Sequence, residues 1–304
     1  MFVKMSDELV KNIVQKDFKS IARAISFVEN EIPGYENLLQ TLPSSASFIV
    51  GVTGPPGAGK STLVDGLIHK MVEENKAVAV LCVDPSSPFN MGSVLGDRIR
   101  MSDWYLHPRV FIRSIATRGS LGGLTPKMVE ITDIMKAAGF NFIIIETVGV
   151  GQSEIEIAGL ADVTIVVMVP EGGDEVQTMK AGIMEIADIF VVNKSDRPGA
   201  DAYVKNLKLK LSHAFHSHEN EVAIIKTIAS EQKGLDDLFV EILEHTKIEK
   251  KPGKKHLLLT EKAYQLIQHH RMKDVDKEDL KKKITEADHT QFNLYNFIQQ
   301  YITS

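Results

Sequence analysis

The sequence predicts an α/β fold in which a mostly parallel, helix-flanked β-sheet forms the central layer. Short apolar runs of strand character alternate with stretches in which apolar residues recur at helical spacing, as in parallel sheets with crossover helices. A glycine-rich loop, residues 54–61, joins the first apolar run to a helical stretch. The expected strands are residues 48–52, 77–83, 110–115, 142–147, 163–169, 187–192 and 222–226.

Helical segments are expected on both sides of this α/β region. Residues 1–45 carry apolar side chains among charged ones and predict an N-terminal helical cap. Those apolar side chains are Leu9, Ile13, Ile21, Ile25 and Val28. Residues 46–246 form the expected α/β domain. A charged stretch broken by Pro252-Gly253 then leads into further helical patterns, so residues 247–304 are predicted to be a linker and a C-terminal helical arm.

Composition and charge narrow the classes of function. The chain has 304 residues, of which 43% are hydrophobic, and its net charge of −5 argues against nonspecific binding to nucleic acid or to an anionic membrane. No apolar run approaches membrane-spanning length, and residues 1–8 lack the apolar segment of a signal peptide. The single cysteine, Cys82, cannot form an internal disulfide, so a reducing, cytoplasmic compartment is expected.

The glycine-rich loop reads Gly-Pro-Pro-Gly-Ala-Gly-Lys-Ser, a complete Walker A motif between a predicted strand and a predicted helix. Its glycines let backbone N–H groups turn toward a polyphosphate, and the helix that follows directs its positive end at the same anion. Lys60 is expected to reach the β and γ phosphates, and the Ser61 hydroxyl to bind Mg²⁺. The motif predicts a P-loop nucleoside triphosphatase with these nucleotide-binding residues: Gly54, Pro55, Pro56, Gly57, Ala58, Gly59, Lys60, Ser61 and Thr62.

A second motif, Asn193-Lys194-Ser195-Asp196, predicts that the base is guanine and the ligand GTP or GDP. It ends an apolar run, at the edge of a parallel sheet where ligands bind. Asp196 can accept from both guanine donors, Asn193 can meet the acceptor side of the ring, and the stem of Lys194 can cover its face. Ala229 and Ser230, within Thr227-Ile228-Ala229-Ser230, are expected to offer backbone N–H groups to the guanine oxygen.

Acidic residues at other strand ends are candidate ligands of the metal. Asp84 closes the second predicted strand and opens a long loop that also contains Asp97. Glu146 closes the fourth predicted strand. Because the carboxyl ends of parallel strands share one edge of a sheet, these three acids and Ser61 are the predicted Mg²⁺ ligands.

The residues that would complete hydrolysis are less evident. Val150 follows Gly149, where Ras-like enzymes carry a water-orienting glutamine. Gln152 is a more distant candidate for that role. Arg118, in a glycine-rich loop, is a candidate internal arginine for the γ-phosphate. Slow hydrolysis that a partner accelerates is therefore expected.

Five stretches of the chain match motifs of one known family. They run from Gly51 to Thr62, Asp84 to Pro88, Arg113 to Gly123, Glu146 to Glu154 and Glu171 to Asp188. Together they resemble the MeaB/ArgK family, the methylmalonyl-CoA mutase-associated GTPases. The order of residues 227–230 and the lysine-rich region after Pro252 depart from the family's pattern.

The resemblance implies a third switch and a partner. Asp174, Gln177 and Lys180 match the polar positions of that switch. Lys180 thereby joins Lys60, Asp97 and Glu146 as a candidate catalytic residue. Members of the family work as homodimers, with C-terminal helices as the dimerisation arm. GTP hydrolysis is expected to gate and protect a cobalamin-dependent acyl-CoA mutase, licensing transfer of adenosylcobalamin from an adenosyltransferase and removal of damaged cofactor.

Two alternative functions share much of this pattern. A metallochaperone GTPase of the nickel-insertion type would need a site of paired cysteines and histidines, for which the chain offers only His213, His216 and His218, or more weakly His269-His270. A noncatalytic GTP-dependent scaffold would use the same acids to hold Mg²⁺ without turnover. Single-turnover hydrolysis in the presence of the partner would distinguish the scaffold.

Overall fold

The computed structural model of the protein describes residues 2–84, 98–117, 124–149, 153–170, 181–214, 222–248, 253–287 and 292–302. Its contacts divide the chain into two compact units, Met1–Lys254 and Lys255–Ser304. The predicted domain boundaries at residues 45 and 246 stay predictions. Within the described residues, no helix is both long and apolar enough to cross a membrane.

The first unit is built on a seven-stranded sheet, in which every described pair of neighbouring strands is parallel. The strand order is β3-β2-β4-β1-β5-β6-β7. The strands are β1 Phe48–Thr53, β2 Val78–Asp84, β3 Val110–Ala116, β4 Phe142–Glu146, β5 Val163–Met168, β6 Ile189–Val192 and β7 Ala223–Lys226. The predicted fold class is therefore confirmed, because each predicted apolar run contains a strand. β1 lies at the centre of the sheet, between β4 and β5.

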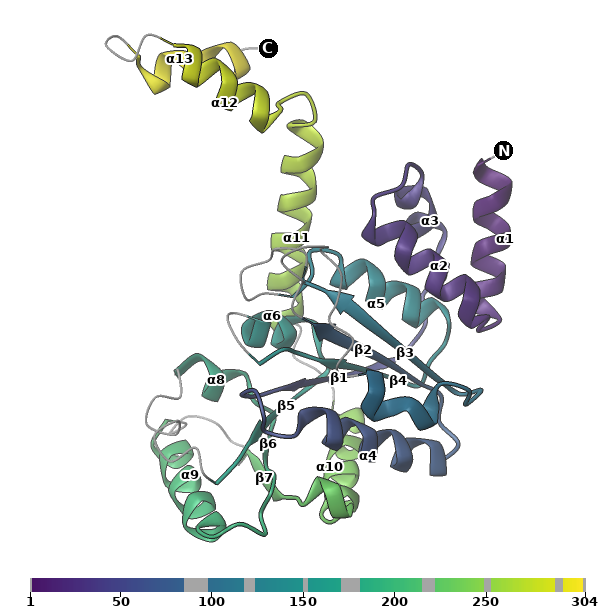
Figure 1. Ribbon diagram of the computed structural model, residues 1–304, viewed down its shortest axis with the longest axis vertical. Coiled ribbons are helices and arrows are strands. Elements are labelled where there is room, and N and C mark those ends of the chain that lie inside the picture. The colour runs from purple at the N-terminus through teal and green to yellow at the C-terminus, as the bar shows by residue number, and fades with distance from the viewer. Residues whose placement is uncertain are drawn as a thin grey trace. The chain divides into compact units, whose positions relative to one another are not determined.

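Helices cover both faces of the sheet, which explains why the strands read as continuous apolar runs (Figure 1). On one face, α4 Lys60–Glu73 and α10 Leu235–Lys247 pack over a core that includes Ile165 and Val167 of β5. The alternate residues Val166 and Met168 join a second core under α9 Ala200–Ala214. The second face also carries α5 Met128–Ala137, α6 Ser153–Leu160 and α8 Ala181–Ile186 (Figure 1).

The three N-terminal helices belong to the same unit as the sheet. They are α1 Phe2–Val14, α2 Phe18–Glu29 and α3 Tyr35–Thr41, and they lie beside α5 (Figure 1). Asp17 caps α2 by accepting a hydrogen bond from Ser20 N at 2.9 Å, and the bonds from Ser20 lower the pKa of that carboxyl. Arg113 of β3 joins the sheet to α2, because its Nη2 donates to Ser26 Oγ at 2.9 Å and to Glu29 Oε2 at 3.3 Å.

The second unit consists of α11 Gly253–Arg271, whose first residues belong to the first unit, α12 Lys277–Glu286 and α13 Leu294–Ile302. Lys283 of α12 donates to Tyr301 Oη of α13 at 3.1 Å, and bonds to Asp279 and Tyr301 raise its pKa to about 12. Apolar side chains remain exposed on these helices: Leu257, Leu259, Tyr264, Leu266, Ile267, Leu294 and Tyr295. A run of exposed apolar side chains on small helices is typical of a surface that another protein covers.

Side-chain acceptors cap backbone N–H groups at the amino edge of the sheet, the edge where the strands begin. Asp162 Oδ2 accepts from Ile49 N at 2.7 Å, and Asp188 Oδ2 accepts from Thr164 N at 2.7 Å. Asn141 Oδ1 accepts in the same way from Ala77 N at 2.8 Å. Each cap satisfies an N–H group that the sheet ladder leaves without a carbonyl.

We predict that Asp188→Ala lowers the free energy of unfolding by about 1–3 kcal/mol, because the N–H of the buried Thr164 would lose its acceptor. Asp188→Asn keeps an acceptor oxygen and should cost less. The control is Asp133→Ala, which removes a half-exposed carboxylate paired with Lys136 on the same helix and should change stability by about 0.5 kcal/mol or less. Urea unfolding measures all three; equal stability of the two alanine variants would contradict the capping role.

Candidate nucleotide site

The predicted motifs meet at the carboxyl edge of the sheet, the edge where the strands end. β1 ends at Thr53, residues 54–59 form the loop, and α4 begins at Lys60. The neighbouring strand β4 brings Glu146 to this edge, and β2 brings Asp84. β6 ends at Val192, directly before Asn193. The sheet order therefore gathers the predicted phosphate-binding, acidic and base-binding residues at one edge of the sheet.

The loop adopts a conformation that requires its glycines. Gly54 and Gly59 have φ angles of +139° and +87°, in the region that side chains rarely adopt. A Cβ on Gly54 would lie 2.1 Å from the carbonyl oxygen of Val167, and a Cβ on Gly59 would lie 2.4 Å from Nδ2 of Asn193. The loop thus packs directly against β5 and Asn193, where only glycine fits.

Lys60 is buried, and its ammonium turns back across the loop. Nζ donates to the carbonyl oxygens of Gly54 at 2.9 Å and Pro55 at 3.1 Å. It also donates to Val148 O at 3.4 Å, in the segment after β4. A cation at this point, beside the N-terminus of α4, is suited to bind phosphate oxygens, which would compete with these carbonyls for its donors.

Oxygen atoms of Ser61 and Glu146 lie in a cluster beside the loop. Ser61 Oγ donates to Glu146 Oε1 at 2.7 Å, and Glu146 is 4% exposed. Asp84, 2% exposed, ends β2, the strand next to β4. A hydroxyl and carboxylates are the donor set that suits Mg²⁺. The described residues contain no group of three or more His, Cys, Asp or Glu side chains that could hold a metal by themselves.

The segment after β4 is held tightly against the loop. Thr147 N donates to Val52 O at 3.0 Å, and the hydroxyls of Thr147 and Thr53 are 2.8 Å apart. Gly149 has a φ of +86°, and a Cβ there would lie 2.0 Å from Gly54 O. A shift of this segment would therefore directly disturb residues 54–59, which we call the phosphate loop.

Asn193 connects the base motif to two other segments. Its Nδ2 donates to Ala58 O at 2.9 Å, and its Oδ1 accepts from Thr227 Oγ1 at 3.0 Å and from Ala229 N at 3.1 Å. The N–H of Ala229, predicted to meet the guanine oxygen, thus faces Asn193 in this structure. Lys194, with φ +55°, donates from Nζ to Gly57 O at 2.8 Å, which lays its stem along the loop.

Asp196 is exposed at the same edge, with charged neighbours that the sequence motif did not single out. Lys233 lies 2.7 Å from Glu231, and this hydrogen bond raises the pKa of Lys233. The charge of Asp196 adds to that rise, so Lys233 lies within electrostatic reach of the predicted guanine acceptor. Ser230 is exposed in the same loop.

Other predicted residues cannot be placed. Asp97, Arg118, Gln152, Asp174, Gln177, Lys180, His216 and His218 lie outside the described residues, as does the side chain of His213. Their predicted roles stay predictions. The sequence motifs gave no binding role to three groups that bond within the site: the Thr147 hydroxyl, the Val148 carbonyl and the Thr227 hydroxyl. Each follows a strand end by one or two residues, and that position is the one signal that points to them.

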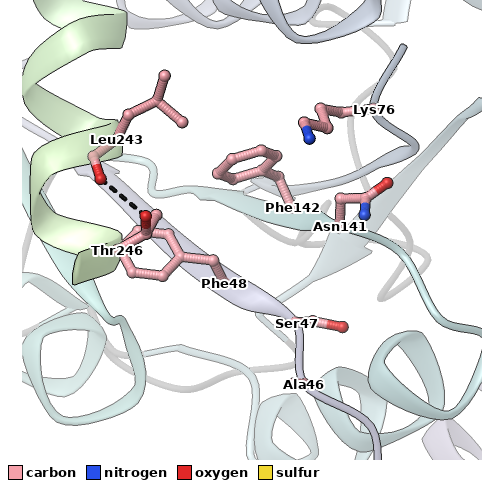
Figure 2. A pocket seen from close by; sticks show the side chains of 8 residues that line it. All are labelled: Ala46, Ser47, Phe48, Lys76, Asn141, Phe142, Leu243 and Thr246. Atoms are coloured by element: carbon pink, nitrogen blue, oxygen red, sulfur yellow. Dashed lines mark hydrogen bonds between the residues drawn. The ribbon is translucent and has the colours of Figure 1, made fainter. Parts of the chain in front are cut away.

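A hollow of about 330 Å³ lies at the opposite, amino edge (Figure 2). The rings of Phe48 and Phe142, 6.1 Å apart, face Leu243 and Thr246 of α10 across it (Figure 2). Phe48 and Phe142 are the first residues of β1 and β4, whereas the phosphate loop follows the last residue of β1. The hollow is therefore separate from the candidate nucleotide site.

Comparisons with known proteins agree with this geometry. The family model described as methylmalonyl-CoA mutase-associated GTPase MeaB matches residues 21–288. A presumed GTPase of Pyrococcus horikoshii is 46% identical over 253 residues, covering 82% of this chain and 80% of that protein. The GTPase ArgK of Escherichia coli is 34% identical over 247 residues, covering 78% of this chain and 75% of that protein. The crystal structure of an LAO/AO transport system kinase is 23% identical in sequence and superposes with a TM-score of 0.66. The match covers 99% of this chain and 98% of the other chain, which shows a shared fold.

We predict that Gly149→Ala weakens GDP binding at least about tenfold, because its Cβ would overlap the carbonyl of Gly54 and push the loop out of shape. The control is Gly199→Ala. That glycine has φ +87°, and no atom lies within 4 Å of the position that an added Cβ would take, so the change should cost only the backbone strain of about 1–2 kcal/mol in stability. Calorimetric titration with GDP and thermal unfolding compare the two variants. Equal GDP affinity would show that the close approach is not needed.

Proposed function

The chain belongs to the family of methylmalonyl-CoA mutase-associated GTPases, and from this premise we propose that its GTP hydrolysis gates and protects a cobalamin-dependent acyl-CoA mutase. The protein is a GTPase. The family match over residues 21–288 supports the mutase as partner. The GTPase part of the proposal is supported by Asn193, whose amide bonds the loop of residues 54–59 at Ala58 and the predicted guanine-contact loop at Ala229. Phosphate-binding and base-binding segments thus form one connected site.

Guanine recognition is assigned to the Asn-Lys-x-Asp segment. The exposed carboxylate of Asp196 can accept from two guanine donors at once, which adenine does not offer. The Nδ2 group of Asn193 donates one of its two hydrogens to Ala58 O, and the second hydrogen can donate to the guanine ring. Lys194, fixed to Gly57 O, presents its aliphatic stem as a cover for the base.

Phosphate binding and hydrolysis are assigned to Lys60 and the oxygen cluster. Ser61, Asp84 and Glu146 fit Mg²⁺, and Asp97 is the further acid proposed to join them. A bound Mg²⁺ would neutralise charge on the β and γ phosphates. Lys60 would supply a cation for the transferred phosphoryl group, once phosphate oxygens replace carbonyl acceptors of its ammonium such as Gly54 O.

Control by a partner is proposed because the sequence lacks a Ras-like water-orienting glutamine directly after Gly149. Val150 stands there, so the isolated protein should hydrolyse GTP slowly and the mutase should accelerate it. Asp174, Gln177 and Lys180 are the proposed sensors of nucleotide state. Hydrolysis would then license adenosylcobalamin loading from an adenosyltransferase and release of damaged cofactor.

A homodimer is proposed for the C-terminal unit. The exposed apolar side chains on α11 and α13, among them Leu257, Leu266 and Tyr295, need a partner surface, and a second copy of the same helices is self-complementary by symmetry. The mass of the full chain in solution, measured by light scattering, tests this; a monomer at micromolar concentration would contradict it.

We predict that Asp196→Asn weakens GTP binding by about 1–3 kcal/mol, because an amide presents one acceptor oxygen where the carboxylate presents two. The control is Asp201→Asn, which changes an exposed aspartate of α9 paired with Lys226 and should leave GTP affinity unchanged. Competition titrations against ATP provide the second measurement. A wild-type protein that binds ATP and GTP equally well would refute guanine specificity.

We predict that Lys180→Ala leaves GTP affinity within a few-fold of normal but abolishes acceleration of hydrolysis by the mutase, because an allosteric signal needs contacts that differ between two states. Lys205→Ala, an exposed lysine of α9, is the control and should keep full stimulation. GTP binding and hydrolysis are measured with and without methylmalonyl-CoA mutase. Intact stimulation of Lys180→Ala would remove Lys180 from the mechanism.

A further inference from the structure

The hollow at the amino edge of the sheet has apolar walls. Its volume of about 330 Å³ falls at the lower end of the range of roughly 300–1,000 Å³ that is usual for ligand pockets. The rings of Phe48 and Phe142 are 6.1 Å apart with 77° between their planes, an edge-on arrangement. Phe239 of α10 meets Phe142 in the same way at 6.3 Å, and Leu243, one turn further along α10, lines the hollow (Figure 2). An apolar body can therefore pack here against ring edges and an aliphatic side chain.

The polar groups on the other side of the hollow are hydrogen-bond donors. Lys76 and Asn141 lie together, on the side opposite Leu243 and Thr246 (Figure 2). The ammonium of Lys76 has three donors and no acceptor. Oδ1 of Asn141 accepts from Ala77 N at 2.8 Å, which fixes the orientation of the amide. Its Nδ2, which has no acceptor among the described residues, offers two more donors to a ligand that can accept from both side chains.

Lys76 gives the hollow a positive charge. Of the described residues that line the hollow, Lys76 is the charged one. Of the two acids that precede it in the chain, Glu73 pairs with Lys70 at 3.5 Å, and Glu74 is exposed, where water weakens the reach of its charge. A ligand that accepts hydrogen bonds from Lys76 therefore binds more tightly as an anion than as a neutral group.

The helix α10 determines which end of such a ligand points toward Lys76. α10 ends at Lys247, so its last turns, with Leu243 and Thr246, form the opposite wall. The carbonyls at the C-terminal end of a helix carry partial negative charge, which repels an anion. Thr246 Oγ1 donates to Leu243 O at 2.7 Å, the dashed line in Figure 2, so its hydrogen is already used. The anionic end of the ligand is expected at Lys76 and the apolar end toward α10.

We propose that the hollow binds a small carboxylic acid, a monoanion with an apolar body. The two oxygens of a carboxylate can accept from Lys76 Nζ and Asn141 Nδ2 at once, while the body packs against Phe48, Phe142 and Leu243. At about 30 Å³ for each water-sized group, the volume holds roughly ten non-hydrogen atoms, about the size of phenylpropionate. The site lies at the edge of the sheet opposite the Walker A motif, and it goes beyond the proposed GTPase function without depending on it.

The probe is phenylpropionate, titrated against the full-length protein and followed by saturation-transfer NMR. The matched compound is phenylpropionamide, which has the same body and no charge. We expect a Kd of about 1 mM for the acid, as for a ligand of this size with an ordinary binding energy per atom. The amide should bind at least about tenfold more weakly, because it cannot pair with the ammonium of Lys76.

Three variants test the two ends of the site. Lys76→Met keeps the length of the side chain and removes its charge, so it should weaken binding of the acid at least about fivefold and leave binding of the amide within about twofold. The control, Lys70→Met, removes a lysine of α4 that is paired with Asp236 at 2.8 Å, and should leave both compounds unaffected. Leu243→Ala should weaken both, because each loses part of the apolar wall. The affinity for GDP should stay at the wild-type value in every variant.

Failure of phenylpropionate to bind at ten times the expected Kd overturns the inference. Equal affinity for acid and amide, or unchanged binding of the acid to Lys76→Met, overturns it too, as does a drop in GDP affinity that matches the loss of acid binding. If neither compound binds while Lys76→Met weakens binding of methylmalonyl-CoA mutase, the hollow is a contact for a protein instead. Loss of the site leaves GTP hydrolysis in place, so its failure is distinguishable from failure of the proposed function.

Discussion

The buried amide of Asn193 is the interaction on which the candidate site depends. A primary amide offers donors on one side and an acceptor on the other, so one side chain can join segments that expose opposite groups. Asn193 uses the donor side for Ala58 O and the acceptor side for Thr227 and the N–H of Ala229. The absence of a side chain at Gly59 follows from it, because any Cβ there would collide with this amide.

The two edges of the sheet are built for different purposes. At the amino edge, short polar side chains such as Asp162 and Asp188 close the ends of the hydrogen-bond ladder, and the connections are tight. At the carboxyl edge the backbone turns sharply at Gly54, Gly59 and Gly149, which have positive φ angles. Polar groups there, among them Lys60 and Ser61, bond across segments rather than within one strand.

The sheet could be predicted from sequence because burial on both faces forces its strands into continuous apolar runs. The Walker A motif was predictable because it is a short contiguous run, residues 54–61, whose glycines determine the local backbone conformation. Strand ends indicated which residues share an edge of the sheet, but individual side-chain bonds between distant segments could not be predicted. The bond from Trp104 to Asp65 joins residues 39 apart, and that from Asn193 to Ala58 joins residues 135 apart, so neither leaves a periodic signal. The close approach of Gly149 to Gly54 is likewise set by strand order.

The N-terminal helices α1, α2 and α3 limit how far the chain can be shortened from its N-terminus. Phe18 of α2 packs against Phe111 of β3 and Phe140, and Ile21, Ile25 and Val28 are completely buried. A chain shortened to begin at the first strand would leave this apolar layer facing water and would leave Arg113 without Ser26 and Glu29. The minimal autonomous folding unit therefore starts well before the Walker A motif. Fusion partners or tags belong ahead of α1, not at the apparent boundary before β1.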